Sequence, residues 1–475
     1  MHSCRFTLHL IAALVVLSGV QAFATQQSNY PKACFTESVT VPDGLYANDD
    51  TDVNAQDAYM RAIALLLDQE SFAQLDCLAD SARKNKDRFS SGNWKLSAIY
   101  DGVAMPIEHA TNEDWNARLI HVQHWVAASP NSITAHIAQA QLYAYLAWEA
   151  RGSGSSDTVS ANGWKVFNER IAEAKRLLEQ SPELKKCPDW YWVMQQVALA
   201  QGWTVAQQRA LFEEAVAFEP TFYPYYRTFS YAMSTSWYGE DGDSEKFAVE
   251  MADRIGGDNG DIIAFEVAAK LAPCCKAEDV IKRISWPRIK RGFTALEKRY
   301  GTSLINLNVM AFMAPLSGGD EIYAHSLFQR IGDQWDKKLW VTQKDFEEQR
   351  TYIAQVVPLR EQQLIRERAA EANLSTPAGA RFAVALERKL QAGADACVNT
   401  VPDKGSKFQI LILLNKSGKL ERAYPDPFTM VSQCLMAKLA DYYGPRAEVL
   451  LVPPQDGYWT RVEFDPASIA KLKTE

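Results

Sequence analysis

The sequence predicts a mainly α-helical protein, in which a degenerate tetratricopeptide-like helical array is followed by a small α+β domain. Apolar residues return at helical spacing from Asp57 to about Gln391, as on the buried face of amphipathic helices. Proline and glycine interrupt this stretch repeatedly, which is typical of helix pairs joined by short connections. After Gln391 the pattern changes to short apolar runs separated by turn residues, which indicates strands.

Composition limits the class of protein and of partner. The chain has 475 residues, of which 47% are hydrophobic and 23% are charged, so it can bury large cores. Fifty Lys and Arg against 58 Asp and Glu leave a net charge of −8. A general nucleic-acid-binding protein usually presents a basic face, so this balance argues against a nucleic-acid partner.

The first 24 residues have the features of a secretory signal peptide. Arg5 precedes an apolar run over residues 8–20, and Ala22-Phe23-Ala24 has the small–x–small pattern of a cleavage site after Ala24. A membrane anchor is the alternative, but this run is shorter than the roughly 20 residues that span a bilayer. We therefore expect a periplasmic or secreted protein without a stable membrane span after cleavage, and an irregular segment over residues 25–54.

The helical domain is expected over residues 55–391. A tetratricopeptide repeat places a Trp and apolar residues on its first helix, and Ala, Phe and Pro on its second. Trp190 and Met194 have the first-helix spacing, and Phe212 and Pro220 have the spacing of the end of the second helix. The other candidate units fit poorly, so the array is degenerate. An irregular helical domain is the alternative.

A small α+β domain is expected over residues 394–475. The apolar runs predict strands at residues 407–414, 419–423, 449–452 and 458–464, with a helix at residues 429–443 before the last two strands. Strands with one helix of this length favour a sheet that is covered by the helix.

Short sequence motifs that contain aromatic residues or glycine follow one another in a defined order along the helical body. They are Trp94-Lys95-Leu96, Tyr100-Asp101-Gly102, Ala147-Trp148-Glu149-Ala150-Arg151-Gly152, Gly163-Trp164, Cys187-Pro188-Asp189-Trp190-Tyr191, Gln201-Gly202-Trp203 and the stretch from Ser236 to Asp243. Over residues 60–345 this order resembles the bacterial domain-of-unknown-function family four-zero-three-four. The resemblance implies a helical, repeat-like bacterial protein and no particular activity.

The C-terminal segment carries a second resemblance. The order of its strands and helix, the Ser417-Gly418-Lys419 turn and the final run from Tyr458 to Phe464 look like the C-terminal domain of TonB-type proteins. The chain has neither a retained anchor helix nor a long proline-rich spacer. The resemblance therefore implies a periplasmic docking module rather than coupling to an inner-membrane motor.

Cleavage of the signal peptide would leave seven of the eight cysteines in the chain. In an oxidising compartment cysteines are usually paired. Cys397 and Cys434 lie in one compact segment and form the first predicted disulfide. A Cys34–Cys77 disulfide would tie the N-terminal segment to the first helices.

The other three cysteines leave one thiol unpaired. We expect Cys187 to pair with Cys274 or with Cys275. Several buried free thiols are the alternative, because connectivity cannot be deduced from sequence alone.

Motifs of common enzymes are missing from the sequence. It contains no nucleophile-elbow, P-loop, zinc-protease or dinucleotide-binding pattern, so we predict no catalytic residue and no cofactor. Four histidines lie within 28 residues, and His121 and His124 would share a helix face. Neutral imidazoles so placed could ligate zinc or copper, with Glu108 or Asp114 completing the site. A partly exposed helix carrying hydrogen-bonded histidines is the alternative.

Eight aromatic residues gather within residues 222–238. Aromatic faces beside polar groups suit recognition of a peptide or a sugar, whereas helix arrays also bury aromatic residues between their layers. The candidate partner-binding residues in and after this cluster are Arg227, Trp237, Tyr238, Glu240 and Asp243.

Two functions are compatible with these patterns. A stacked helical array presents an extended concave surface, so we expect a non-enzymatic exported protein that binds a protein or peptide partner in the cell envelope. The alternative is an envelope-polymer hydrolase that uses carboxylates near the aromatic cluster at residues 222–243.

Overall fold

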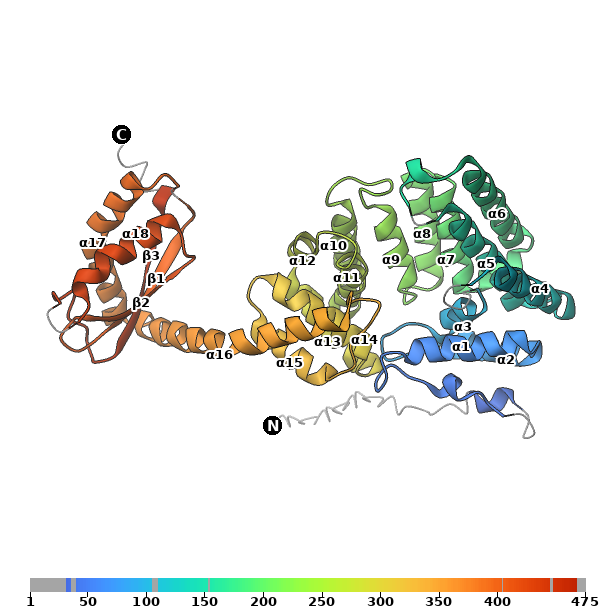
Figure 1. Cartoon of the computed structure of the whole chain (residues 1–475), viewed down its shortest axis with the longest axis horizontal. Helices are drawn as coiled ribbons and strands as arrows, with labels where there is room; N and C mark the ends of the chain where they lie inside the picture. Colours follow the sequence, from blue (N-terminus) through green and yellow to red (C-terminus); the bar gives the residue numbers. More distant parts are fainter. Residues whose placement is uncertain are drawn as a thin grey trace, which may run out of the picture. The chain divides into compact units, whose positions relative to one another are not determined.

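The computed structural model describes residues 31–35, 40–104, 110–152, 154–403, 405–444 and 447–467 (Figure 1). Within them lie 18 α-helices and one three-stranded sheet, which confirms a mainly helical protein with a small sheet near the C-terminus. The predicted signal peptide, residues 1–24, lies outside the described residues.

Contacts divide the chain into two units, which are described separately. The first unit consists of Met1–Cys275 and Arg283–Asn306, and the second of Lys276–Lys282 and Leu307–Glu475. No helix in the described parts of either unit is long and apolar enough to cross a membrane.

The first unit is an array of helices (Figure 1). They are α1 (Ala55–Asp68), α2 (Phe72–Asn85), α3 (Lys95–Ala104), α4 (Asn112–Ala128), α5 (Ile133–Arg151), α6 (Ala161–Glu179), α7 (Pro188–Ala200), α8 (Val205–Phe218), α9 (Pro224–Ala232), α10 (Asp243–Ile255), α11 (Gly257–Leu271) and α13 (Trp286–Tyr300). A 3₁₀ turn, η4 (Pro182–Lys186), precedes α7. Proline opens α7 and α9, where its fixed φ suits the first helical turn.

The odd-numbered helices of this unit form one continuous layer. Each of α1, α3, α5, α7, α9 and α11 contacts the next odd-numbered helix, and α11 contacts α13. The even-numbered helices from α2 to α10 pack on this layer; α6, α8 and α10 each contact two consecutive odd-numbered helices, and α2 and α4 each contact α1, α3 and α5. Close approach depends on small residues: a Cβ added at Gly292 of α13 would lie 1.9 Å from the Asp261 carbonyl oxygen of α11.

Burial follows this layering. Helix α5 lies within the layer, and many of its buried residues are alanines. Their small side chains let the neighbouring helices approach closely. Helix α6 packs on the layer and buries one face only, with Phe167, Ile171, Ala174 and Leu178 inside. That face follows the helical period predicted from the sequence.

The loop between α2 and α3 connects the beginning of this unit to its later helices. The Arg88 guanidinium lies 4.5 Å from the ring centroid of Trp94, 5.4 Å from that of Tyr223 and 5.1 Å from that of Tyr300. It also donates to the Thr221 carbonyl oxygen at 3.1 Å. Cation–π and hydrogen-bond contacts thus hold α9 and α13 to the N-terminal part of the unit.

Four further helices and the sheet make up most of the second unit. Its elements are α15 (Glu321–Ile331), α16 (Gln343–Leu374), α17 (Pro377–Thr400), β1 (Phe408–Leu414), β2 (Leu420–Asp426), α18 (Met430–Lys438) and β3 (Tyr458–Phe464), while α12 (Ala277–Ile284) and α14 (Leu304–Met313) cross between the units. Phe312, Phe328, Trp340 and Phe346 form an aromatic cluster beside α15 and the start of α16.

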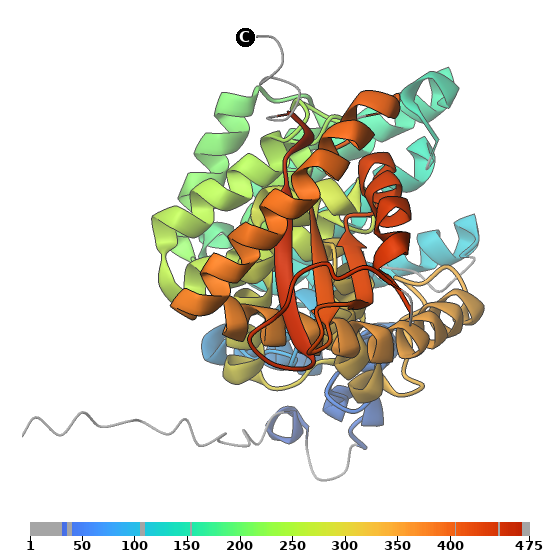
Figure 2. The same cartoon turned by 90° about the vertical axis from the view of Figure 1, so that its left-hand side faces the viewer.

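The sheet has the order β2-β1-β3, with antiparallel neighbours. Ile410 and Ile412 of the central strand join a core with α17 and α18, which lie across one face of the sheet (Figure 2). On the other face Tyr424 and Trp459 stack, and Arg366 of α16 lies 4.2 Å from the Tyr424 ring centroid. Both faces are therefore covered, which explains why six of the seven residues of β1 are apolar, with Gln409 as the exception.

Two details of the predicted C-terminal domain differ in the structure. Residues 449–452, predicted as a strand, form no strand; instead the Leu450 N–H donates to the Gly418 carbonyl oxygen at 2.8 Å, beside the turn after β1. The boundary expected at residues 391–394 lies inside α17. Leu386 and Leu390 of that helix belong to the same core as the sheet, so the unit begins before this boundary.

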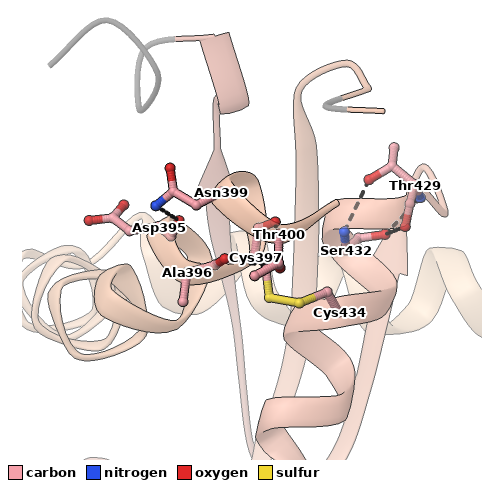
Figure 3. Close-up of a disulfide and its surroundings, with 8 residues drawn as sticks. All are labelled: Asp395, Ala396, Cys397, Asn399, Thr400, Thr429, Ser432 and Cys434. Atoms are coloured by element: carbon pink, nitrogen blue, oxygen red, sulfur yellow. Dashed lines mark hydrogen bonds between the residues drawn. A yellow bond between two sulfur atoms is a disulfide. The ribbon is translucent and has the colours of Figure 1, made fainter. Parts of the chain in front are cut away.

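Both predicted cysteine pairs are joined in the structure. Cys34 and Cys77 are linked with their Cα atoms 5.6 Å apart, and so are Cys397 and Cys434. The second disulfide joins the end of α17 to α18, next to the Thr429 side chain that caps α18 (Figure 3). The predicted partner of Cys187 is wrong: Cys187 is a buried free thiol that lies 3.3 Å from the Tyr100 hydroxyl.

Candidate functional site

A groove lies between α6 and α8 in the first unit, with α7 as its floor. We call it the α6–α8 groove; its lining includes Leu178, Lys185, Trp190, Met194, Trp203 and Glu214. Its volume is about 560 Å³. Sites for small molecules and side chains commonly have volumes of about 300–1,000 Å³.

The floor of the groove is apolar and rigid. Trp190 and Met194 lie one helical turn apart on α7 and are 4% and 2% exposed. The Trp190 indole N–H donates to the Leu178 carbonyl oxygen at 2.8 Å, which holds the ring against α6. Trp203, in the turn before α8, is half-buried, and its carbonyl oxygen accepts a hydrogen bond from Gln208 at 2.8 Å.

The rim of the groove carries charges of both signs. Lys185 of η4 donates to Glu214 Oε1 of α8 at 2.9 Å, and both side chains are about half exposed. The Tyr191 hydroxyl donates to the same carboxylate oxygen at 3.1 Å. Burial, followed by the Glu214 carboxylate, raises the pKa of Tyr191 to about 12, so this hydroxyl stays a donor at neutral pH.

Two cations lie beside the aromatic rings of the groove. The Lys185 ammonium lies 4.8 Å from the Trp190 ring centroid, and the Lys175 ammonium lies 5.7 Å from that of Trp203. Lys175 also pairs with Glu179 at 3.5 Å. Each lysine is thus shared between a ring and a carboxylate, and the rim is close to electrically neutral.

This arrangement can bind an apolar side chain and the polar groups next to it. Tryptophan rings offer large contact area at low side-chain entropy cost. The exposed ion pair of Lys185 and Glu214 offers one donor and one acceptor to a main chain. Exposed ion pairs are worth only about 0–1 kcal/mol, so a ligand can replace this pair at small cost.

A buried polar cluster lies behind the groove, at the first turn of α7. Asp189, next to Trp190 in the sequence, points into the unit and is fully buried. Its Oδ1 accepts from the Ser97 hydroxyl at 2.9 Å, and its Oδ2 has no hydrogen-bond partner within the described residues. Burial raises the pKa of Asp189 to about 8, so this carboxyl is mainly protonated at neutral pH.

The predicted partner-binding residues do not form one exposed surface. Arg227 pairs with buried Glu266 at 3.1 Å and donates to Asn93 at 3.0 Å. Trp237 is half-buried, with its ring centroid 5.8 Å from that of Trp148. Tyr238 is 39% exposed, and its hydroxyl donates to the Leu199 carbonyl oxygen at 2.7 Å.

The carboxylates proposed for a hydrolase have local structural contacts. Asp243 accepts from the Glu240 N–H at 2.9 Å, at the start of α10. Glu240 itself is exposed. Arg283 pairs with Asp241 at 2.7 Å and approaches Glu245 at 3.6 Å. These contacts give no observation in favour of catalysis at residues 240–245.

Most of the aromatic cluster at residues 222–238 belongs to the core. Phe222, Tyr223, Tyr225, Tyr226 and Phe229 are all buried. The hydroxyl groups of the three tyrosines have internal partners; that of Tyr225, for example, donates to the Pro188 carbonyl oxygen at 2.9 Å. Packing between helix layers, rather than a binding groove, accounts for this cluster.

The two candidate metal ligands share one carboxylate. His121 Nδ1 and His124 Nδ1 lie 3.2 Å and 2.7 Å from the same Glu70 oxygen. Asp114 caps α4 through Thr111, and Glu108 lies outside the described residues. Within the described chain no group of three or more His, Cys, Asp or Glu is arranged to hold a metal ion, and a site completed by Glu108 stays a prediction.

Comparison with known proteins adds no assignment. No protein-family model, curated protein or solved structure matches the chain. The two family resemblances therefore stay predictions from the sequence.

Sequence reasoning identified part of the groove. Trp190 and Met194 were singled out by their repeat-like spacing, and Trp203 by its place in a Gly-Trp word. Lys185 and Glu214 carry no such signal, because they are 29 residues apart and meet only when α8 folds back beside η4.

Proposed function

We propose that this chain is an exported helical-repeat protein that binds an extended peptide segment of a protein partner in the cell envelope. The partner places a large apolar side chain in the α6–α8 groove. The C-terminal α+β domain serves as a second docking module. The observation that carries the proposal is the apolar floor of Trp190 and Met194 beneath a rim that is exposed and nearly neutral.

The layering of the first unit supports a tetratricopeptide-like array. In such arrays the first helices of successive pairs pack on one another and the second helices cover them. Here the odd-numbered helices form the continuous layer, and the even-numbered ones lie between consecutive members of it. The repeat-like residues Trp190 and Met194 of α7 and Phe212 of α8 are all buried at this interface.

The chemistry of the groove favours a neutral segment with an apolar anchor. Lys185 and Lys175 at the rim each have a carboxylate partner. The groove therefore attracts neither acidic nor basic peptides strongly. Apolar area buried on the half-buried Trp203 ring and on the apolar side chain that the ligand inserts supplies most of the binding free energy. The ion pair at the rim then sets the register of the peptide main chain.

Selection of peptides on the purified full-length chain tests the proposal. We expect a phage-displayed peptide library to yield segments with one Trp, Phe, Tyr or Leu anchor and little net charge. Trp203→Ala is expected to weaken a selected peptide about tenfold or more, as for an interface hot spot. Lys185→Glu places two carboxylates together and should also weaken binding.

A matched control variant distinguishes binding in the groove from non-specific binding to exposed aromatic residues. Tyr46→Ala removes an aromatic side chain that is 53% exposed outside the groove, and it should leave the affinity unchanged. The proposal fails if no peptide is enriched, or if the selected peptides bind Trp203→Ala as tightly as the unaltered chain. Binding of envelope-polymer oligosaccharides in place of peptides, with loss on Trp203→Ala, would also overturn it.

A further inference from the structure

Two adjacent cysteines, Cys274 and Cys275, lie exposed just after α11. Their Sγ atoms are 2.8 Å apart, closer than sulfur atoms that merely pack. The N–H groups of both residues donate to the Leu271 carbonyl oxygen, at 3.1 and 2.9 Å, so the turn that carries them is well defined. The two thiols are therefore presented side by side to solvent.

The other cysteines of the described chain are committed elsewhere. Four of them form the two disulfides. Cys187 is buried at the start of α7 against Tyr100, away from solvent. Cys274 and Cys275 are thus left with each other as the available partner.

We propose that Cys274 and Cys275 form a redox-active dithiol that closes reversibly into a vicinal disulfide by exchange with disulfide-bearing molecules. In the first step one Cys thiolate attacks a sulfur of an external disulfide, R–S–S–R, and releases R–S⁻. In the second step the neighbouring thiolate attacks the mixed disulfide and releases the second R–S⁻. The sum is the loss of two hydrogens from the cysteine pair and the reduction of one external disulfide to two thiols.

The surroundings indicate which sulfur acts first. Burial, followed by the neighbouring Cys274 thiol, raises the pKa of Cys275 to about 12, so Cys275 is poorly suited to be the attacking thiolate. Cys274 is therefore the attacking residue and Cys275 the resolving one. The Cys274 thiol also donates to the Leu271 carbonyl oxygen at 3.3 Å, a hydrogen bond that is lost when Cys274 reacts. Slow exchange is the expected consequence.

A disulfide between adjacent residues is strained. Consecutive Cα atoms are about 3.8 Å apart across a trans peptide, whereas disulfides usually join Cα atoms about 4.4–6.8 Å apart. The two structural disulfides, at 5.6 Å, lie within that range. Strained and exposed disulfides are the more easily reduced ones, so the vicinal pair should open and close while the other two disulfides remain intact.

Thiol mapping of the full-length chain in glutathione buffers tests this site. Trypsin cleaves after Lys270 and Lys276 and so isolates both cysteines on one peptide, residues 271–276. Under reducing glutathione that peptide should take up two N-ethylmaleimide groups. Under oxidised glutathione it should take up none and weigh two hydrogens less. Dithiothreitol should reopen it at a concentration about tenfold or more below that which reduces Cys397–Cys434.

The cysteine variants and the opposite results complete the test. Cys274→Ser should abolish the two-hydrogen loss and leave Cys275 alkylated or carrying one glutathione. The proposal is overturned if the peptide keeps both thiols under oxidised glutathione, stops at a glutathione adduct in the unaltered chain, or appears linked to the Cys187 peptide. Reduction together with Cys397–Cys434 would equally contradict a strained, labile pair.

Discussion

Replacing Asp189 by asparagine tests the buried cluster behind the α6–α8 groove. The Asp189 carboxyl is fully buried and accepts one hydrogen bond, from Ser97. Burial raises its pKa to about 8 in the folded protein, against 3.8 for an aspartate side chain in water. Asparagine keeps the shape and the acceptor oxygen, and it removes the ionisation.

The sign of the effect follows from proton binding. Between the unfolded pKa near 3.8 and the folded value of about 8, the folded chain holds a proton at Asp189 that the unfolded chain has lost. The stability contributed by this group is therefore full at low pH and is lost as the pH rises towards 8. Each pH unit between the two pKa values costs about 1.4 kcal/mol, so the loss by pH 7 is on the order of 4 kcal/mol.

Urea unfolding at a series of pH values measures this loss. Ten of the 13 tryptophans lie in the first unit, so their fluorescence reports mainly on its unfolding. Relative to Asp189→Asn, the unaltered chain should lose about 1.4 kcal/mol per pH unit from about pH 5 to pH 7, and less per unit as the pH approaches 8. Asp241→Asn, at an exposed carboxylate, is the control and should track the unaltered chain. Parallel pH profiles for Asp189→Asn and the unaltered chain would refute the reasoning.

Three further substitutions have expected outcomes that unfolding experiments can check. Joint replacement of Cys397 and Cys434 by Ala should destabilise the second unit by about 4 kcal/mol, because the disulfide closes a loop of 37 residues; an unchanged urea midpoint would contradict this. Gly292→Ala should lower the melting temperature by forcing α13 away from the Asp261 carbonyl oxygen, at a cost of roughly 1–3 kcal/mol. Phe212→Ala should cost roughly 3–5 kcal/mol, and a loss below 1 kcal/mol would mean that α8 is loosely packed.

Local patterns in the sequence predicted a mainly helical body followed by a small sheet, although not every element. The helical period of residues 164–178 matches the buried face of α6, and the apolar run at residues 407–414 matches β1. These two predictions hold because the pattern of buried positions in a helix or a buried strand repeats every few residues. The run at residues 449–452 failed because a short apolar segment can also be buried as a loop against a turn.

Contacts between residues far apart in the sequence could not be predicted from such local patterns. The aromatic cluster after residue 222 looked suited to binding, yet α7, α8 and α10 cover it, and Arg227 meets Glu266, 39 residues away. His121 and His124 on α4 likewise contact Glu70, which lies 51 and 54 residues away, rather than an acidic residue close to them in the sequence. Composition shows which side chains are present, but only packing shows which of them face each other.

By itself, the sequence determined a helical body with a small sheet after it, because hydrophobic periodicity and turn residues act over short range. Only the tertiary structure decided where a binding site can lie. The α6–α8 groove exists because α6 and α8 stand on either side of α7, which brings Lys185 to Glu214 and exposes one side of Trp203. The same packing buried Cys187 and left Cys274 and Cys275 in solvent, since burial depends on which helices meet rather than on residue type.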